Sequence, residues 1–189
     1  MQEGYKWVRE GKVSILAPDP GLYRRSDGVY EPAWAPVFYN PRMVFNRDMA
    51  ILVARALFRE GEWVFAEPLA GTGVRSVRLL VEAGARYGVL NDLDPRACRL
   101  AARNLLANGL GGRAHVYCME ASLLLRMLAW SGMRFDYVDI DPFGSPMPFV
   151  EAALLSLRRG GILAVTATDT APLSGTHPQA CLRRYQARP

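Results

Sequence analysis

The sequence predicts an α/β fold in which a mostly parallel β-sheet carries helices on both faces. Between residues 46 and 189, five short segments rich in β-branched and aromatic residues alternate with segments of helical length. A turn with two glycines, EPLAGTG at residues 67–73, follows the first of these strands. Because strands joined through helices run parallel and make right-handed crossovers, this alternation indicates a doubly wound sheet.

The chain divides into an arm over residues 1–45 and a domain over residues 46–189. The arm is rich in Pro, Gly, Tyr and Trp without a sustained period, which is typical of an irregular segment with short strands. Apolar residues then recur at helical spacing from Met49 to Leu57, and Gly61 follows. This spacing predicts an amphipathic helix over residues 47–59.

The elements of the domain follow in a regular order. The segments WVFAE, YGVLND, HVYCM, FDYVDI and ILAVTAT predict strands at 63–67, 87–92, 115–119, 135–140 and 162–168. Helices are expected at 74–83, 96–108, from after 119 through 128, and at 149–157. Asp94-Pro95 suits an N-cap and first-turn proline, and Asn108-Gly109 suits a helix stop.

The last predicted strand, 162–168, has no obvious neighbour on one side. Residues 172–189 are polar and basic, with Arg183, Arg184 and Arg188, and show no further strand pattern. In a sheet ordered 3-2-1-4-5 this strand lies at an edge and exposes unpaired backbone groups. We therefore expect a domain that is incomplete at its carboxyl end, with a second polypeptide or self-association covering residues 162–168.

Composition narrows the class of protein. The chain has 189 residues, half of them hydrophobic, which suits one globular domain. No stretch approaches the roughly 20 apolar residues of a membrane helix, and the amino terminus lacks a secretory pattern, so we expect a cytoplasmic protein. The three cysteines, Cys98, Cys118 and Cys181, are too scattered for a disulfide framework or zinc site. We expect them to be buried and expect no metal site.

The positive charge is carried almost wholly by arginine. The net charge is +5, the sequence pI is about 9.4, and the only lysines are Lys6 and Lys12. Arginine suits phosphate because its planar fork donates two parallel hydrogen bonds. Arginine bias can also reflect genome composition. Judged from charge alone, RNA binding and the absence of RNA binding are therefore equally good interpretations.

The glycine turn and the end of the second strand predict a ligand site. Gly71 and Gly73 let a ligand approach the backbone where a Cβ would block it. Ser76 stands where a dinucleotide fingerprint has its third glycine, which disfavours a nicotinamide dehydrogenase. Asp92 ends the second strand and could accept hydrogen bonds from both ribose hydroxyls. The alternative for Asp92 is a helix cap, a role that Asp94 already fits.

Glu120 and Ala121 follow the third strand at the same edge of the sheet. The Glu120 carboxylate could accept a hydrogen bond from an adenine amino group. An N-cap for the next helix explains it equally well.

The most informative motif is DIDPFGSP at residues 139–146, at the end of the fourth strand. Asp141, Pro142 and Phe143 supply a carboxylate, a backbone carbonyl and an aromatic face beside the switch point where such sheets bind ligands. Both oxygens can accept hydrogens of an exocyclic amine while the ring stacks on a flat base. The alternative is an Asx-Pro turn without a chemical role.

The order of these motifs resembles that of class I methyltransferases, which have a Rossmann-like fold. Four segments further resemble the tRNA guanine-26 N2-dimethyltransferase family: VFYNPRMVFNRD (37–48), EPLAGTGVRSVR (67–78), DIDPFGSP (139–146) and TATDTAPLSGTHPQACLRRY (166–185). The similarity runs from about Glu10 to the last residue.

The resemblance implies an S-adenosylmethionine-dependent enzyme that methylates the exocyclic N2 of a tRNA guanine, with residues 1–45 contributing to the active site. It places Arg47 near the methionine carboxylate and Arg75 in the glycine loop. It makes Phe38 and Phe143 the aromatic pair that encloses the guanine, and Asp141 and Pro142 the residues that hold its amine.

Two alternatives stay open. Asp-Pro-aromatic motifs also serve N6 methylation of adenine. The family continues into two further strands and a tRNA-binding domain, which this sequence lacks, so the chain could be a catalytically incomplete subunit that binds cofactor and needs a second chain.

Overall fold

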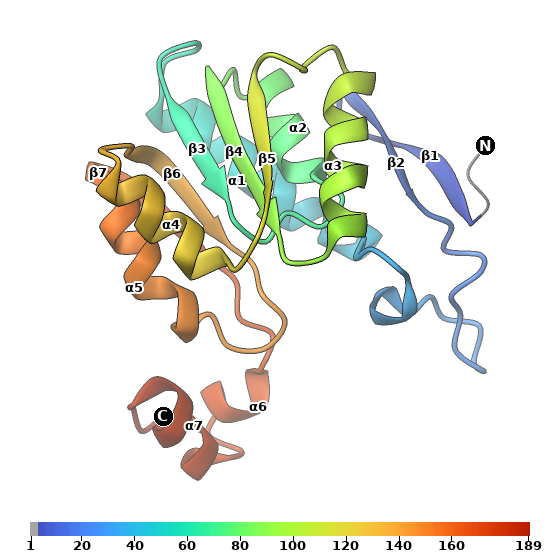
Figure 1. Ribbon diagram of the computed structural model, residues 1–189. Helices are drawn as coiled ribbons and strands as arrows, with labels where there is room; N and C mark the ends of the chain where they lie inside the picture. Colours follow the sequence, from blue (N-terminus) through green and yellow to red (C-terminus); the bar gives the residue numbers. More distant parts are fainter. Residues whose placement is uncertain (1–3) are drawn as a thin grey trace.

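The computed structural model describes residues 4–189 and contains a five-stranded parallel sheet and a separate antiparallel hairpin (Figure 1). The strands are β1 (Tyr5–Glu10), β2 (Val13–Pro18), β3 (Val64–Glu67), β4 (Tyr87–Asp92), β5 (Ala114–Cys118), β6 (Phe135–Ile140) and β7 (Leu157–Val165). The α-helices are α1 (Val44–Leu57), α2 (Val74–Val81), α3 (Pro95–Ala107), α4 (Ala121–Trp130), α5 (Met147–Ser156), α6 (Thr170–Leu173) and α7 (Pro178–Tyr185). The large sheet has the order β5-β4-β3-β6-β7, which confirms the predicted order 3-2-1-4-5.

The predicted start of the last strand at residue 162 is wrong. β7 begins at Leu157, directly after α5, and includes Gly160 and Gly161. Its register against β6 is irregular between the pair Phe135–Leu157 and the pair Tyr137–Ile162. Gly160 has a φ of +80°, a conformation that glycine adopts without strain. The two glycines therefore form a bulge inside the strand instead of a turn before it.

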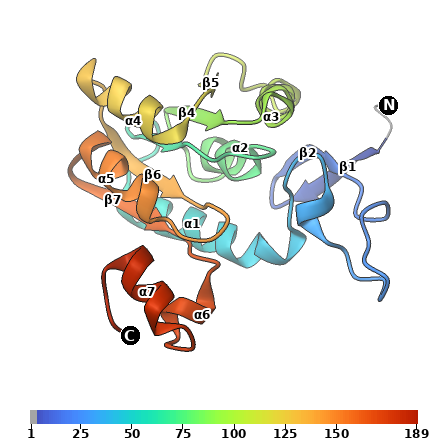
Figure 2. The same ribbon diagram turned by 60° about the horizontal axis from the view of Figure 1, so that its bottom comes forward.

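Alternation along the strands divides the core into two layers. Val64 and Ala66 face the cluster that α4 and α5 cover, whereas Phe65 between them faces the cluster under α1, α2 and α3. Successive residues of a strand point to opposite faces, which produces this division. Figure 2 shows the two groups of helices on opposite sides of the sheet.

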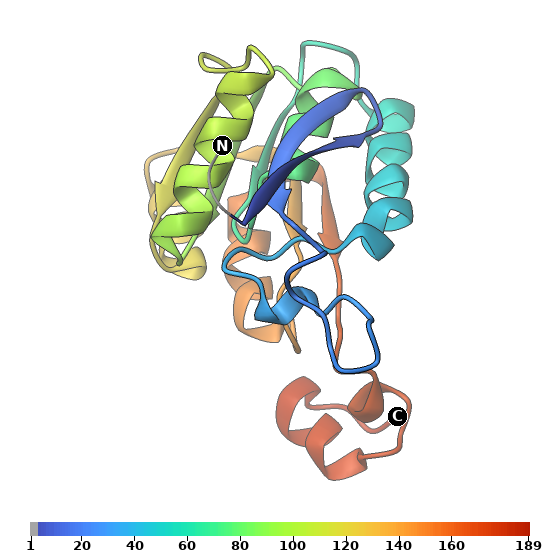
Figure 3. The same cartoon turned by 90° about the vertical axis from the view of Figure 1, so that its right-hand side faces the viewer.

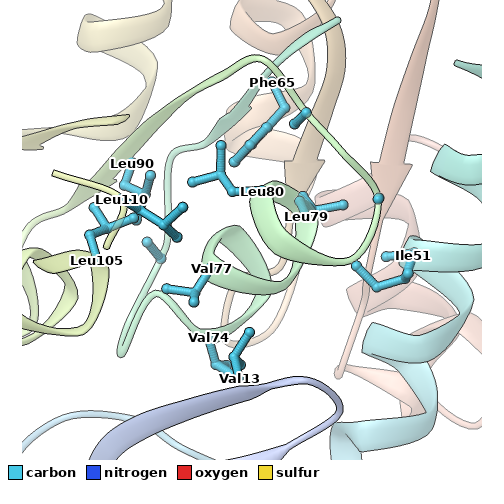
Figure 4. Close-up of a cluster of buried hydrophobic side chains, with 14 of the residues drawn as sticks. Val13, Ile51, Phe65, Val74, Val77, Leu79, Leu80, Leu90, Leu105 and Leu110 are labelled. Carbon is cyan, nitrogen blue, oxygen red and sulfur yellow. The ribbon is translucent and has the colours of Figure 1, made fainter. Parts of the chain in front are cut away.

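The β1–β2 hairpin packs into the core through α2. Val13 lies against Val74 and Val77 in the cluster that also contains Ile15 (Figure 4). Figure 3 shows the hairpin crossing α2 between α3 and α1. The predicted short strands of the arm are thus present, and the hairpin shares its core with the sheet. The division of the chain at residue 45 stays a prediction.

Two asparagines, Asn104 on α3 and Asn108 at its C-cap, fix the position of β2 along the helix. The side-chain amide of Asn104 donates to the carbonyl of Leu16 at 3.0 Å and accepts from its backbone N–H at 2.7 Å. Asn108, one helical turn later, makes the same pair of contacts with Ser14, at 2.8 and 3.3 Å. Alternate residues of β2 therefore pair with side chains one turn apart on α3.

The expectation that all three cysteines are buried is wrong for one of them. Cys98 and Cys181 are buried, but Cys118 is exposed because it ends β5, the edge strand of the sheet. Among residues 4–189 no helix is long and apolar enough to cross a membrane.

Candidate active site

A cavity of about 280 Å³ opens at the carboxyl ends of the central strands. Its lining includes residues from the arm, from α1, from the glycine turn and from the loop after β6. It brings together eight of the predicted site residues: Phe38, Arg47, Gly71, Arg75, Asp92, Asp141, Pro142 and Phe143. Gly73, Glu120 and Ala121 lie outside this lining.

The two glycines of the turn both have left-handed backbones, with φ of +53° at Gly71 and +73° at Gly73. A Cβ on Gly71 would lie 3.1 Å from the carbonyl oxygen of Phe38. A Cβ on Gly73 would lie 3.0 Å from the Cβ of Ala101 on α3. Gly71 therefore allows the arm to approach the cavity, whereas Gly73 allows α2 and α3 to pack closely.

Asp92 joins the glycine turn to the end of β4. Its Oδ2 accepts from the Gly71 N–H at 2.9 Å, and its Oδ1 accepts from the Asp94 N–H at 3.0 Å. Each carboxylate oxygen retains a lone pair for a further donor. The N-cap of α3 is Asp94, whose side chain accepts from the Arg96 N–H at 2.8 Å. Because Asp94 caps the helix, the carboxylate of Asp92 lines the cavity with lone pairs that can accept from a ligand.

Glu120 is the N-cap of α4, as its alternative interpretation predicted. Its two oxygens accept from the N–H groups of Ser122, at 2.9 Å, and Leu123, at 2.6 Å. The side chain is exposed, and Ala121 behind it is buried. A contact of this pair with adenine stays a prediction.

Phe38 and Phe143 meet edge to face above Asp141. Their ring centroids are 4.8 Å apart and the planes make an angle of 85°. Phe143 is 70% exposed, so one ring of the pair faces the solvent. A second cavity, of about 260 Å³, shares both rings, Asp141 and Pro142 with the first and extends to Glu31. Asn40 and Met43 also line both cavities, and with them these four residues form the wall between the two cavities.

The guanidinium of Arg75 lies next to three carboxylates, those of Glu67, Asp139 and Asp141. Arg75 donates from Nη1 to Asp139 Oδ2 and from Nη2 to Asp141 Oδ2, both at 2.6 Å. Its Nε lies 3.5 Å from Glu67 Oε1, too far to make a hydrogen bond in this geometry. Asp139 also accepts from the Tyr137 hydroxyl at 2.6 Å, while its Oδ1 is buried without a partner.

Burial dominates the electrostatics of this cluster. It raises the pKa of Glu67 to about 7, opposed by the Arg75 charge and reinforced by Asp139. Burial also raises the pKa of Asp141, with Arg75 again opposing the shift and Asp139 adding to it. The cluster thus carries more carboxylates than its single guanidinium neutralises.

Arg47 is held by the amino-terminal hairpin. Its Nε and Nη2 donate to the two carboxylate oxygens of Glu10, at 2.6 and 2.7 Å, and Nη2 also donates to the Asn40 carbonyl at 3.1 Å. Arg78 donates to the same Glu10 at 3.0 Å. A guanidinium has five N–H groups, so the two on Nη1 of Arg47 remain for a ligand.

Several residues that shape the site had no role in the sequence analysis. Asp139 was detectable, because it lies on β6 only two residues before Asp141. Asn104, which donates to the Thr72 carbonyl of the glycine turn at 2.9 Å, and Glu10 act over long sequence separations that no local pattern reveals. Thr168 accepts from the Gly144 N–H at 2.7 Å and so ties the loop after β6 to the segment after β7.

Comparisons with known proteins agree with this architecture. Residues 14–189 match the family described as N2,N2-dimethylguanosine tRNA methyltransferase. The chain is 45% identical over 186 residues to the tRNA (guanine(26)-N(2)/guanine(27)-N(2))-dimethyltransferase of Aquifex aeolicus, covering 96% of this chain and 45% of that protein. It is 47% identical over 180 residues to the tRNA (guanine(26)-N(2))-dimethyltransferase of Pyrobaculum arsenaticum, covering 95% and 47%.

Solved structures show the same fold. A Pyrococcus horikoshii structure described as Trm1 with S-adenosyl-L-methionine matches with a TM-score of 0.81 at 38% identity, over 97% of this chain and 48% of that one. A SAM-dependent methyltransferase from Agrobacterium tumefaciens matches with a TM-score of 0.66 at 17% identity, over 88% and 54%, which shows the fold alone.

The sheet order, the glycine turn and the cavity at the carboxyl edge define a protein with the Rossmann-like fold of class I methyltransferases. The family match covers nearly all of the described chain. This chain belongs to the N2,N2-dimethylguanosine tRNA methyltransferase family. It spans about half the length of the curated relatives that it matches.

Proposed function

We propose that this chain carries the S-adenosylmethionine-dependent transfer of methyl groups to the exocyclic N2 of guanine 26 in tRNA, giving N2-methyl- and N2,N2-dimethylguanosine. The observation that carries the proposal is the wall between the two cavities. Asp141, Pro142 and the two phenylalanines border both, so an acceptor for an amine lies where the two cavities meet.

The first cavity suits the cofactor. Asp92 has acceptors for two ribose hydroxyls, and the remaining N–H groups of Arg47 suit the carboxylate of the methionine part. Gly71 lines this cavity and lets the arm close over it, and Gly73 keeps α2 packed against α3 behind it. Glu120 and Ala121, at the end of the next strand, would border the adenine.

The second cavity suits the target base. A flat ring between two aromatic rings needs roughly 7 Å between them, since carbon atoms pack at about 3.5 Å. The edge-to-face contact of Phe38 and Phe143 leaves no such slot, so the exposed Phe143 ring must swing away when the base enters. A guanine in a tRNA stem must also be flipped out, and the two rings replace its lost stacking.

The residues of the wall orient the amine. The Asp141 carboxylate and the Pro142 carbonyl accept the two N2 hydrogens, which directs the nitrogen lone pair toward the first cavity. Asp92 and Arg47 would hold S-adenosylmethionine, which would supply an electrophilic methyl group to the nitrogen, its sulfur keeping the electron pair of the methyl bond. The nitrogen then loses one proton, and Asp141 is placed to accept it. The protein mainly aligns the reacting atoms and excludes water.

The partner and the location follow from the same proposal. The excess of arginine suits the phosphates of a tRNA, and a tRNA-modifying enzyme works in the cytoplasm. β7 pairs within the described sheet only with β6, and Val165 is 47% exposed. We therefore also propose that a second polypeptide or a second copy covers this edge. Sedimentation of the purified chain at increasing concentration tests self-association.

Two substitutions test the assignment of the cavities. Asp141→Asn should abolish methyl transfer to tRNA while cofactor affinity stays within a few fold, because it alters the acceptor of the amine. Asp92→Asn should weaken the cofactor first, because it removes the carboxylate from the ribose site. Cofactor binding by calorimetry and transfer of labelled methyl groups separate the two effects. An Asp141→Asn protein that keeps most of its activity would contradict the proposal.

A further inference from the structure

We infer that Arg75 is a positioning residue for Asp141: its guanidinium fork fixes the carboxylate of Asp141 and keeps it ionised. This inference rests on the proposed function for the importance of Asp141. What is inferred beyond that function is that the orientation and the ionisation of the Asp141 carboxylate depend on Arg75.

The fork of Arg75 reaches two carboxylates that are close in sequence. Asp139 lies on β6, and Asp141 is the first residue after this strand. Nη1 reaches Asp139 and Nη2 reaches Asp141, each at 2.6 Å. Nη2 also donates to Asn46 Oδ1 on α1 at 2.9 Å. Arg75 is only 4% exposed, so the surrounding packing leaves its fork little freedom.

The charges around Asp141 make this contact important. Asp139 on β6 repels the ionised form of Asp141, as does Glu67 on β3 through its place in the cluster. The favourable neighbours are Arg75 on α2, Arg47 on α1 and Thr166 after β7. Arg75 contacts Asp141 directly and is the largest favourable influence on its pKa. Without it, burial and the nearby carboxylates would drive Asp141 to hold a proton and to lose its orientation.

If Asp141 held a proton, the oxygen carrying that proton could no longer accept a hydrogen bond from the amine. Arg75 stands two residues after Gly73, in the first turn of the helix that the glycine turn begins. The same helix therefore borders the cofactor cavity and holds the acceptor for the amine. This placement explains why an arginine is buried in the first turn of α2, where its Nη groups donate to two carboxylates and an amide. A direct contact of Arg75 with the cofactor stays a prediction.

Arg78 provides a matched control. It lies on the same helix, is 3% exposed, and pairs with the carboxylates of Glu10, Asp48 and Glu82. Replacing either arginine thus removes a buried guanidinium from α2 and leaves acidic partners behind. Only Arg75 touches Asp141. A general loss of packing in α2 would affect both variants, whereas a positioning effect on Asp141 appears in one.

The test is the titration of Asp141 itself, followed by NMR of the chain with 13C-labelled aspartate side chains. Asp141→Asn identifies the resonance by its loss. In Arg75→Met the midpoint should rise by about one pH unit or more, as expected for removal of an opposite charge in direct contact. Arg75→Lys, which keeps the charge without the fork, should show a smaller rise. Arg78→Met should leave the midpoint within a few tenths of a pH unit.

An unchanged midpoint in folded Arg75→Met, or an equal rise in Arg78→Met, would overturn the inference. If Arg75→Met does not fold, an unchanged midpoint in Arg75→Lys would do the same. Where methyl transfer is measurable, the acid limb of the rate should shift with the midpoint. The titration does not require methyl transfer. A chain that transfers no methyl group would therefore contradict the proposed function, whereas the role of Arg75 would still be decided by the midpoint of Asp141.

Discussion

Glu67 should make the stability of this protein depend on pH near neutrality. The side chain is 4% exposed, and burial raises its pKa from an ordinary 4.5 to about 7, against the opposing charge of Arg75. Between these two values the folded state holds a proton that the unfolded state has released. The free energy of unfolding is therefore highest below pH 4.5 for this group and falls as the pH rises through 7.

The size of the effect follows from the displacement of the pKa. At about 1.36 kcal/mol per pH unit, the change from 4.5 to about 7 corresponds to at most about 3 kcal/mol between pH 5 and pH 8. The raised pKa of Asp141 adds a contribution of the same sign. In Glu67→Gln the titrating group is gone, so the decrease over this range should be smaller by about 1–3 kcal/mol.

Urea unfolding at pH 5 and pH 8 measures both proteins in the same way. The comparison uses the difference between the two pH values, so a constant effect of the amide on packing cancels. An equal decrease in wild type and Glu67→Gln would refute the argument that a buried Glu67 carries the proton.

Three further substitutions test the packing and the base site. Asn104→Ala should lower the free energy of unfolding by about 3 kcal/mol in urea titrations, because three buried hydrogen bonds to backbone are lost. Gly88→Ala should cost about 1–3 kcal/mol in the same assay, because its Cβ would lie 2.4 Å from the Phe65 ring, which is fully buried. Phe143→Ala should raise the KM for tRNA by about tenfold or more in a methyl-transfer assay, with cofactor affinity unchanged, because a flipped base loses one stacking partner.

Each of these has a control within the chain. Asn108→Ala removes the more exposed copy of the hairpin contact and should cost less than Asn104→Ala. Gly112→Ala, where a Cβ meets nothing within 4 Å, should be nearly neutral. For Phe143→Ala, an equal weakening of cofactor and tRNA would count against a role at the base alone.

The sheet and much of the candidate site were predictable from local patterns. Alternating strands and helices fixed the order of the sheet, since crossovers of one hand permit few arrangements. The glycine turn, Asp92 and the motif at 139–146 each follow a strand, so a parallel sheet places all of them at one edge. The cavity lining contains Gly71, Asp92 and residues 141–143, whereas Gly73 lies outside it, as do Glu120 and Ala121 after another strand.

The remaining features depend on contacts between distant parts of the chain. Glu10 meets Arg47 and Arg78 only because the hairpin folds over α2, and Asn104 pairs with Leu16 across 88 residues. No period or motif records such pairings. The bulge at Gly160 was also missed, because two glycines indicate a turn as readily as an irregular strand.

The most direct test of the central claim is nucleoside analysis after reaction. The purified chain is incubated with methyl-labelled S-adenosylmethionine and an unmodified tRNA that carries guanine 26, beside the same tRNA with adenine at that position. The account predicts labelled N2-methylguanosine or its dimethyl form in the first tRNA and no label in the second. Labelled N6-methyladenosine, or cofactor binding without any labelled nucleoside, would contradict the claim that these 189 residues carry guanine N2 transfer.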